Sequence, residues 1–300
     1  MEIPSIVIIG SSNTDMVIKS PHLPAPGETI LGGTFFMNAG GKGANQAVAA
    51  ARLGGQVSLI AKVGKDIFGK QAIQLFKKEG IDVSSVLKDR NLPSGIALIT
   101  VDDRAENCIV VASGANAALT PANIKKFREK IESASIVLMQ LETPLNTIAY
   151  AASVAFKKAI KVILNPAPAC PLHDELLRTI SIITPNEKEA EMLTGIIVND
   201  IPSAEQAALA LYNKGIETVI ITLGAKGALL YHEHKFSLIE TPKVEAVDTT
   251  AAGDVFNGAL AVALSEGITM NEAVSFACRA ASISVTRLGA QASAPYKNEL

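Results

Sequence analysis

One stretch of this 300-residue chain indicates both its fold and its chemistry: Val247-Asp248-Thr249-Thr250-Ala251-Ala252-Gly253-Asp254-Val255-Phe256-Asn257-Gly258. Small residues occupy positions 251 to 253, an acid follows at 254, and a helical pattern continues through Leu264. We therefore expect a loop that enters a helix, with the backbone N–H groups of 251 to 253 unobstructed by side chains. Because a helix N-terminus carries unsatisfied N–H groups and partial positive charge, the stretch predicts an anion site suited to a phosphate.

Asp254 fits two roles in such a site. An acid in the first turn of a helix complements the helix dipole and needs no further function. Alternatively, its carboxylate is a base that takes a proton from a hydroxyl, while the N–H groups stabilise the charge that develops on a transferred phosphoryl group. The rest of the chain has to decide between these roles.

The composition is that of an ordinary globular protein, since 48% of the residues are hydrophobic and 19% are charged. A formal net charge of −2 provides no broad basic field for nucleic acid or an anionic membrane, and the absence of Trp disfavours base stacking. We therefore expect neither nucleic acid nor a membrane as a partner.

The three cysteines, Cys108, Cys170 and Cys278, are odd in number, widely spaced and form no C-x-x-C motif. This pattern argues against a disulfide framework or a structural zinc site, and it indicates a reducing, cytoplasmic compartment. The N-terminal apolar run Ile6–Ile9 is too short for a signal sequence, and no apolar run approaches the length of a membrane span.

Hydrophobic patterning predicts an α/β fold. The continuous apolar run Ser5–Ile9 is typical of a strand buried on both faces of a parallel sheet. From residue 120 onward, helical and strand patterns alternate, as they do around a doubly wound sheet. Helices are expected at 121–133, 144–158, 186–193, 203–214, 252–265 and 270–286, and strands at 135–140, 160–164, 180–184, 217–222, 227–231 and 235–239. We predict a single domain over residues 1–300, with a doubly wound, mostly parallel sheet flanked by helices.

A second group of strands leaves this regular pattern. Its members are separated by prolines, a glycine or a polar turn: Met16–Lys19, Thr29–Phe36, Ile96–Val101 and Asn107–Val111. We predict that they form a small separate sheet, a sub-domain of approximately residues 14–37 and 95–112. Such a sheet beside an active site would act as a lid.

Unusual polar residues fall where the predicted strands end. The carboxyl ends of parallel strands meet at one edge of a sheet, where open α/β proteins bind their ligands. These residues are Asn13 and Asp15, Glu142, Asn165, Asn186 and Glu189, Thr222 with Gly224 and Gly227, and Asp248 to Asp254. A surface turn explains any one of them equally well. Their joint placement predicts a ligand cleft.

Two of these segments have a structural alternative. Asn186 and Glu189 open a predicted helix, where they can form a capping box without any further function. In the functional interpretation Glu189 organises Mg²⁺ through its waters, because Mg²⁺ keeps much of its hydration. The segment Thr222–Gly227 is either a simple hairpin turn or a backbone that lines a nucleotide.

A glycine-rich turn, Asn38-Ala-Gly-Gly-Lys-Gly-Ala-Asn-Gln46, enters an Ala-rich helix. Its spacing matches neither a Walker A loop nor a dinucleotide-binding G-x-G-x-x-G. Glycines here would let a ligand approach the backbone closely, with Lys42 and Asn45 offering polar contacts. The alternative is capping and close packing of the helix.

These motifs together resemble the ribokinase (PfkB-type) carbohydrate kinase family, over nearly the whole chain. The matching segments are Asn13-Thr-Asp15, Pro26-Gly-Glu-Thr29, Gly40-Gly-Lys-Gly-Ala-Asn-Gln46, Leu138-Met-Gln-Leu-Glu142, Asn165-Pro-Ala-Pro168, Thr184-Pro-Asn-Glu187 with Glu189, Thr222-Leu-Gly224 and Asp248-Thr-Thr-Ala-Ala-Gly-Asp254. The resemblance implies a large α/β domain with a β-sheet lid and a homodimer formed through the lids. The reaction it implies is ATP-dependent phosphorylation of D-ribose at O5, giving D-ribose 5-phosphate and ADP.

The resemblance also implies roles for individual residues. Asp254 would be the catalytic base, with Ala251, Ala252 and Gly253 completing an anion hole at 251–254. The residues that would bind the sugar are Asn13, Thr14, Asp15, Gly41, Lys42, Gly43, Ala44, Asn45, Glu142 and Asp254.

Nucleotide and metal positions follow in the same way. The residues implied at ATP are Asn186, Thr222, Leu223, Gly224, Ala225, Lys226, Gly227, Gly253 and Cys278, and Glu189 would act on Mg²⁺ through water. An activating K⁺ is implied at Asp248, Thr250, Ser284, Arg287, Gly289 and Ser293. Relatives often carry a histidine near position 278, so the cysteine is a departure, and the chain stops soon after Pro295-Tyr296, where relatives commonly continue.

Three alternatives remain open at this point. The same chemistry is possible on deoxyribose, fructose or a nucleoside, although the scarcity of aromatics disfavours clamping a base. A sugar-binding regulator without catalysis would not need Asp254 and its loop, and a lyase or glycosidase on this fold would not need the segment 222–227. Sugar-dependent ADP release discriminates among them.

Overall fold

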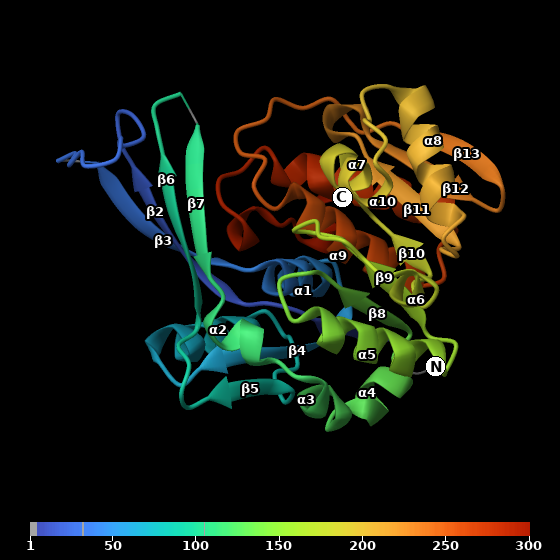
Figure 1. The fold of residues 1–300 in the computed structure, drawn as a ribbon, viewed down its shortest axis with the longest axis horizontal. Coiled ribbons are helices and arrows are strands. Elements are labelled where there is room, and N and C mark those ends of the chain that lie inside the picture. Colours follow the sequence, from blue (N-terminus) through green and yellow to red (C-terminus); the bar gives the residue numbers. More distant parts are fainter. Residues whose placement is uncertain (1–4, 32, 105) are drawn as a thin grey trace.

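The structure, a computed structural model, describes residues 5–31, 33–104 and 106–300. Within these residues the chain forms two sheets, and Figure 1 shows the smaller one standing at one side of the larger, helix-covered body. The large sheet has nine strands in the order β13 (Lys235–Ile239), β12 (Ala228–His232), β11 (Thr218–Thr222), β10 (Ile182–Ile183), β9 (Lys161–Leu164), β8 (Ile136–Met139), β1 (Ser5–Ile9), β4 (Gln56–Gly64) and β5 (Val86–Asp89).

The large sheet is parallel from β11 to β5, and only β12 and β13 run antiparallel to their neighbours. The apolar run Ser5–Ile9 supplies the β1 strand, whose alternate residues enter two different cores. Ile6 and Ile8 pack into one, and Val7 and Ile9 into the other. Burial on both faces is the reason this strand reads as a continuous apolar run.

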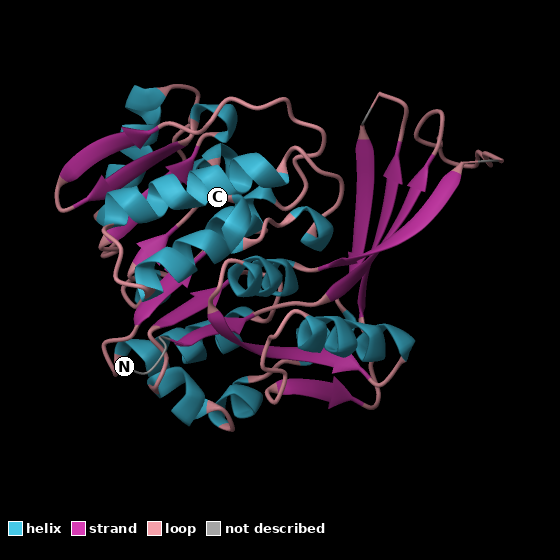
Figure 2. Ribbon diagram, turned by 180° about the vertical axis from the view of Figure 1, so that it is seen from behind, coloured by secondary structure: helices cyan, strands magenta, loops and turns pink. Residues whose placement is uncertain are grey.

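Helices cover both faces of the large sheet, as Figure 2 also shows. One face is covered by α1 (Lys42–Arg52), α2 (Ile67–Lys78), α9 (Ala252–Ser265) and α10 (Met270–Ser284). The other is covered by α3 (Pro121–Lys125), α4 (Arg128–Glu132), α5 (Leu145–Phe156), α6 (Asp174–Leu177), α7 (Glu187–Thr194) and α8 (Ile201–Tyr212). Short 3₁₀ helices are η1 (Gly114–Ala118), η2 (Gly224–Lys226), η3 (Gln291–Ser293) and η4 (Lys297–Glu299). The predicted doubly wound α/β fold is confirmed.

The small sheet has four strands in the order β3 (Thr34–Gly40), β2 (Asn13–Lys19), β6 (Gly95–Val101) and β7 (Asn107–Ala112). Its central pair, β2 and β6, is parallel, and the two outer pairs are antiparallel. Residues 38 to 40 and 13 to 15 pair at the base of this sheet, next to the large one.

Three predicted boundaries were wrong, and two elements were not predicted. The helix expected at 121–133 is two short helices, because the chain leaves the helical conformation at Phe127. The strand expected at Thr29–Phe36 begins only at Thr34, the residue that pairs with the last residue of β2, and one of its expected residues, 32, lies outside the described ranges. Asn13 to Asp15 belong to β2 and not to a turn, because β3 and β6 pair with them on both sides. The β5 strand and α6 were not predicted.

Among the residues that the structure describes, no helix is both long enough and apolar enough to cross a lipid bilayer.

Candidate active site

The N-terminus of α9 forms as the small residues at 251 to 253 predict. Ala251 caps the helix in a left-handed conformation, with a φ of 61°, which is uncommon for a residue with a Cβ. The Ala252 N–H donates to Thr249 O at 3.3 Å, whereas the N–H groups of Gly253 and Asp254 donate to no acceptor among the described residues. Two backbone donors are therefore available to an anion at the positive end of the helix dipole.

Gly253 borders the cleft, and the space that a side chain at this position would occupy is open. A Cβ built on Gly253 would have no heavy atom within 4 Å, outside its own helix and its chain neighbours, so no packing contact of the chain accounts for a glycine here. Gly43 differs in this respect, because its Cβ would lie 2.6 Å from the backbone of Gly10. At Gly43 the glycine is needed to pack the start of α1 against the end of β1, so the packing alternative holds for that position.

The Asp254 carboxylate is buried and held from both sides by amide groups of α1. Asn45 Nδ2 donates to Oδ2 at 2.9 Å, and Gln46 Nε2 donates to Oδ1 at 2.9 Å. Gln46 Nε2 also lies 3.1 Å from Asn165 Oδ1, and Gln140 Nε2 donates to Gln46 Oε1. An acid that only complemented the helix dipole would face solvent, so this directed arrangement supports the role of a base.

One acceptor beside Asp254 has no partner. Asn45 is buried, and its Oδ1 accepts no hydrogen bond from the described residues. A buried polar atom without a partner is costly, typically by about 1–3 kcal/mol. A ligand hydroxyl that donates to Oδ1 would remove this cost.

Three further charged residues, Asp15, Lys42 and Glu142, lie near Asp254. Glu142 Oε2 accepts the Lys42 N–H at 3.0 Å and the Ser11 hydroxyl, so it joins the ends of β1 and β8 to the start of α1. Burial is the largest cause of the raised pKa of Asp15, about 6, and the charges of Glu142 and Asp254 raise it further. Asp15, Glu142 and Asp254 thus form one acidic cluster near Lys42.

The lysine and the base influence each other. Burial alone would lower the pKa of Lys42, but the surrounding carboxylates, Asp254 first and Glu142 next, outweigh it and raise that pKa. Burial raises the pKa of Asp254, while Lys42 and the amide hydrogen bonds oppose the shift. Lys42 therefore stays protonated, and Asp254 is a stronger base than an exposed aspartate.

A cleft of about 670 Å³ opens on the other side of Asp254. Its lining includes twelve of the predicted site residues: Lys42, Asn186, Glu189, Thr222, Gly224, Ala225, Gly227, Ala251, Ala252, Gly253, Asp254 and Cys278. Leu223 is buried behind the cleft and Lys226 is exposed, so neither lines it. The volume lies within the usual range of small-molecule sites.

Asn186 and Glu189 combine the two interpretations given to them. Asn186 Oδ1 accepts the Glu189 N–H at 2.8 Å, and Glu189 Oε2 accepts the Asn186 N–H at 2.9 Å, so the predicted capping box is present. Both residues also line the cleft. Glu189 Oε1 makes no hydrogen bond to the described residues, and burial raises the pKa of this carboxyl. One carboxylate oxygen thus remains available inside the cleft.

Asp248 joins two loops behind the cleft. Its Oδ1 accepts the Thr250 N–H and its Oδ2 the Gly289 N–H, both at 2.9 Å. Burial works against the ionised form, but these hydrogen bonds outweigh it and lower the pKa of Asp248. The carbonyl oxygens of Thr250, Gly289 and Ser293 accept no hydrogen bond from the described residues.

The remaining two positions expected at a monovalent cation differ in their surroundings. The Ser284 side chain is buried, and its hydroxyl donates to Ala281 O at 2.8 Å. Arg287 is partly exposed and forms an ion pair with Glu299. The Arg287 side chain is therefore engaged elsewhere, and only backbone atoms of that residue remain for a cation.

Several residues of the site were missed from the sequence. Gln46, which donates to Asp254, and Gln140, which donates to Gln46, were seen only as parts of motifs, because no local pattern shows where an amide points. Asn165, which accepts from Gln46, was expected at the cleft, but its link to Asp254 through Gln46 was not. The apolar wall of the cleft was also missed; it includes Thr241, Pro242, Val244, Ala246, Phe256, Ala281 and Val285. The one sequence signal for this wall was Pro242, which lies in a stretch without strand or helix periodicity and so indicates a loop.

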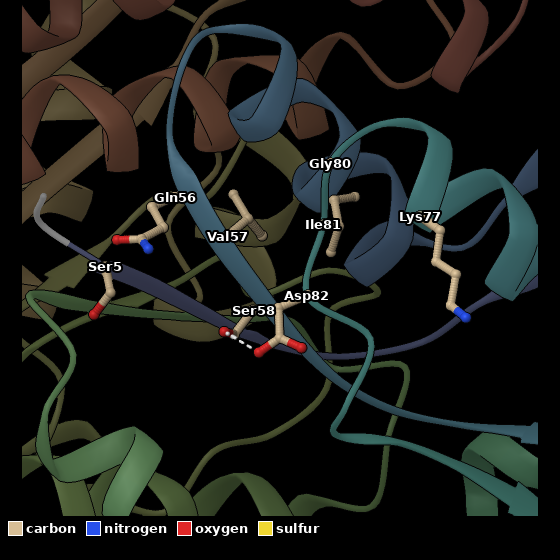
Figure 3. Close-up of a pocket in the computed structure, with 8 residues that line it drawn as sticks. All are labelled: Ser5, Gln56, Val57, Ser58, Lys77, Gly80, Ile81 and Asp82. Carbon is tan, nitrogen blue, oxygen red and sulfur yellow. Dashed lines mark hydrogen bonds between the residues drawn. The ribbon is translucent and has the colours of Figure 1, made fainter.

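A second hollow lies at the opposite edge of the large sheet, at the beginning of β1 and β4. Its volume is about 370 Å³, and Figure 3 shows Asp82 hydrogen-bonded to Ser58 within it. Asp82 also accepts the Ser84 N–H at 2.8 Å and pairs with Lys130. Because this carboxylate is fully partnered by the chain, the hollow offers no candidate chemistry.

The raised pKa of Asp15 has a consequence for stability. A carboxyl that binds its proton more tightly in the folded than in the unfolded protein stabilises the fold at low pH, and this stabilisation is lost as the pH rises from about 4 to above 6. Replacing Asp15 with Asn removes the ionisation. We expect Asp15→Asn to increase the free energy of unfolding at pH 8 by on the order of 1–3 kcal/mol, with little change at pH 4.

Urea unfolding of both proteins at pH 4 and pH 8 measures this effect. Asp103→Asn is a suitable control, because Asp103 is an exposed aspartate in the turn between β6 and β7. If Asp15→Asn is no more stable than the native protein at pH 8, the Asp15 carboxylate is not destabilised by burial and by neighbouring negative charges, and the assignment is wrong.

Comparison with known proteins agrees with this geometry. The profile of the pfkB family carbohydrate kinases matches residues 4–297. The chain is 48% identical to the ribokinase of Haemophilus influenzae, covering 98% of this chain and 96% of the relative, and 37% identical to the deoxyribokinase of Salmonella typhi, covering 97% and 95%. The structure of Arabidopsis thaliana ribokinase, complexed with ribose and ATP, superposes with a TM-score of 0.94 at 34% identity, covering 99% of this chain and 97% of that one. The chain therefore belongs to the pfkB family of carbohydrate kinases.

Proposed function

We propose that this chain transfers the terminal phosphoryl group of ATP to O5 of D-ribose, giving D-ribose 5-phosphate and ADP. The observation that carries the proposal is the position of Asp254. On one side it faces an acidic and amide-rich cluster with an unpartnered acceptor at Asn45, and on the other it borders the 670 Å³ cleft. Two free N–H groups lie at the boundary between them.

The sugar side suits a small polyhydroxylated substrate. Asp15 and Glu142 accept hydrogen bonds from hydroxyls, and Asn45 Oδ1 is an acceptor that needs one. The residues named on this side of Asp254, Asp15, Asn45 and Glu142, include no aromatic surface for a nucleobase. A site that is built to bond hydroxyls rejects analogues that lack them, often by orders of magnitude.

The chemistry needs positioning and charge stabilisation more than covalent help from the protein. Asp254, held in place by Asn45 and Gln46, takes the proton of the sugar hydroxyl as its oxygen attacks phosphorus. The N–H groups of Gly253 and Asp254 and the Lys42 ammonium face the charge on the transferred group. ADP leaves along the cleft.

Two cations belong to the proposal. The single available carboxylate oxygen of Glu189 fits a Mg²⁺ that is held mainly by ATP phosphates and water, where the ion would neutralise phosphate charge. The free carbonyls of Thr250, Gly289 and Ser293, in loops joined by Asp248, fit a K⁺ that would stabilise the loop before α9.

The small sheet supports the proposal of a homodimer. Met37, Met16, Leu98 and Val110 lie opposite one another in a row across all four strands, on the face opposite to that of Asp15. Met37, Leu98 and Val110 are each at least half exposed. An apolar row of this kind on a sheet indicates an interface, and a second copy of the same sheet would cover it.

We expect Leu98→Glu to convert the dimer into a monomer, because a charge would be buried at the centre of the row. Light scattering after size-exclusion chromatography measures the mass. Phe156→Glu is the matched control, since Phe156 is 57% exposed on α5, away from the small sheet. A native protein that is monomeric at micromolar concentration would contradict the proposal.

The test of the reaction is coupled ADP release with Mg²⁺ and ATP, across ribose, 2-deoxyribose, fructose and adenosine. The likeness to a deoxyribokinase makes 2-deoxyribose the second candidate substrate. Turnover that is greatest with ribose, and that falls when K⁺ is replaced by a large organic cation, supports the whole proposal. Turnover with ribose that does not depend on K⁺ would support the kinase activity and contradict the proposed cation site. Ribose binding without ADP release would indicate a regulator.

The cysteines of this chain are free, and ATP is the phosphoryl donor of the proposed reaction. Both features suit the reducing cytoplasm, where we place the reaction.

A further inference from the structure

Asn116 occupies the junction between the two sheets. It lies in η1, directly after the chain leaves β7 and returns to the large domain, and its side chain is 1% exposed. The connection from β1 to β2 passes beside it through Ser12 and Asn13. Neither the sequence motifs nor the proposed chemistry assigns this residue a role.

The backbone of Ser12 fixes the orientation of the Asn116 amide. Asn116 Oδ1 accepts the Ser12 N–H at 3.0 Å, and Asn116 Nδ2 donates to Ser12 O at 3.2 Å. A backbone N–H can only donate and a backbone carbonyl can only accept. The two ends of the Asn116 amide therefore cannot be exchanged without losing both bonds.

This orientation in turn fixes Asn13. Asn116 Nδ2 also donates to Asn13 Oδ1 at 2.8 Å, so the oxygen of Asn13 is the end that faces Asn116. The Nδ2 group of Asn13 makes no hydrogen bond to the described residues, although Asn13 is only 8% exposed. Asn13 therefore presents a donor, not an acceptor, on the face of β2 that also carries Asp15.

The contact between the two amides is closely enclosed by β6. A Cβ on Gly95 would lie 2.2 Å from Asn13 Oδ1 and 2.3 Å from Asn116 Nδ2. No side chain at position 95 fits there, and Asn116 Nδ2 is the side-chain donor that the Asn13 oxygen has among the described residues.

We propose that Asn116 is a positioning residue for sugar recognition, which holds Asn13 with its N–H group directed to a sugar oxygen. The proposal rests on the proposed function, because it takes the pocket around Asp15 and Asn45 to bind the sugar. Under this proposal the polar groups of the sugar site include both acceptors and a donor. Asp15 and Asn45 accept hydrogen bonds from hydroxyls, and Asn13 donates one.

The test is a double-mutant cycle between positions 13 and 116, measured as KM for ribose, KM for ATP and kcat. Asn116→Asp keeps the shape and the acceptor for Ser12 N–H but removes the donor, so the Asn13 amide turns its N–H group away from the sugar. We expect KM for ribose to rise about 10- to 100-fold, the effect of one lost directed hydrogen bond, with KM for ATP unchanged. In an Asn13→Ala background, the same substitution should add less than about twofold.

A second variant, which leaves Asn116 unchanged, tests the proposal even if Asn116→Asp does not fold. Asn13→Asp retains an acceptor for Asn116 Nδ2 but has no N–H group to offer the sugar, so KM for ribose should rise similarly. Ser94→Ala is the matched control, because the Ser94 hydroxyl accepts the Gly64 N–H at 3.0 Å and donates to Asp66 at 2.7 Å in the same junction. It should lower the melting temperature without changing KM for ribose.

Two results would overturn the inference. A normal KM for ribose in Asn13→Asp would show that no donor is needed at position 13. A rise in KM from Asn116→Asp that persists in full in the Asn13→Ala background would show that Asn116 acts through the junction and not through Asn13. Failure of the proposed function is distinguishable, because the native protein itself would then release no ADP with ribose.

Discussion

We expect Asp254→Asn to yield a folded protein that still binds ATP but has lost most of its turnover, by roughly 10²–10⁴-fold in kcat. The amide has nearly the shape of the carboxylate and keeps an oxygen that accepts one of the two hydrogen bonds from Asn45 and Gln46. It cannot take a proton from the attacking hydroxyl. Removal of a buried charge also relieves the desolvation that raises the pKa of Asp254, so we expect the fold to be retained.

The measurement is ribose-dependent ADP release, together with ATP affinity by calorimetry and the melting temperature. Glu272→Gln is the control for the alternative role of Asp254, because Glu272 is an acid in the first turn of α10, where it complements a helix dipole. If Asp254 did no more than this, both substitutions would cost a few tenths to about 1 kcal/mol of stability and leave turnover unchanged. Near-normal kcat in folded Asp254→Asn would therefore remove the assignment of the base.

Gly253→Ala is expected to separate stability from activity. The added Cβ meets no heavy atom within 4 Å beyond its own helix and chain neighbours, and alanine favours a helix over glycine by about 0.5–1 kcal/mol, so the free energy of unfolding should stay unchanged or increase. In a helix the Cβ is tilted toward the N-terminus, so the added methyl group would project toward the end where the two free N–H groups lie. If a phosphoryl group binds there, the donors are obstructed and kcat should fall by about 10²–10³-fold.

Gly258→Ala, in the same helix, provides the contrast in stability. Its Cβ would lie 2.8 Å from Gln46 O and 2.9 Å from Ala49 Cβ, so this substitution should be destabilising. Urea unfolding and steady-state kinetics of both variants measure the two effects. A Gly253→Ala enzyme with unchanged kcat would place the transferred phosphoryl group elsewhere.

Local sequence determines much of the framework. The apolar run Ser5–Ile9 predicted a strand buried on both faces, and the small residues before Asp254 predicted a helix N-terminus with free N–H groups, because both features depend only on neighbouring residues. The capping box of Asn186 and Glu189 is equally local, since its partners are three residues apart. These predictions needed no knowledge of long-range contacts.

Only the tertiary structure decided which groups meet at the site. Asn13 to Asp15 look like a turn in the sequence, yet they form a strand because β3 and β6, from distant parts of the chain, pair with them. Gln46 reaches Asp254 across 208 positions of sequence and Asn116 reaches Asn13 across 103, and neither contact leaves a periodic signal. Periodicity reports which face of an element is buried, but the direction of a hydrogen-bonding side chain depends on the partner that the fold brings to it.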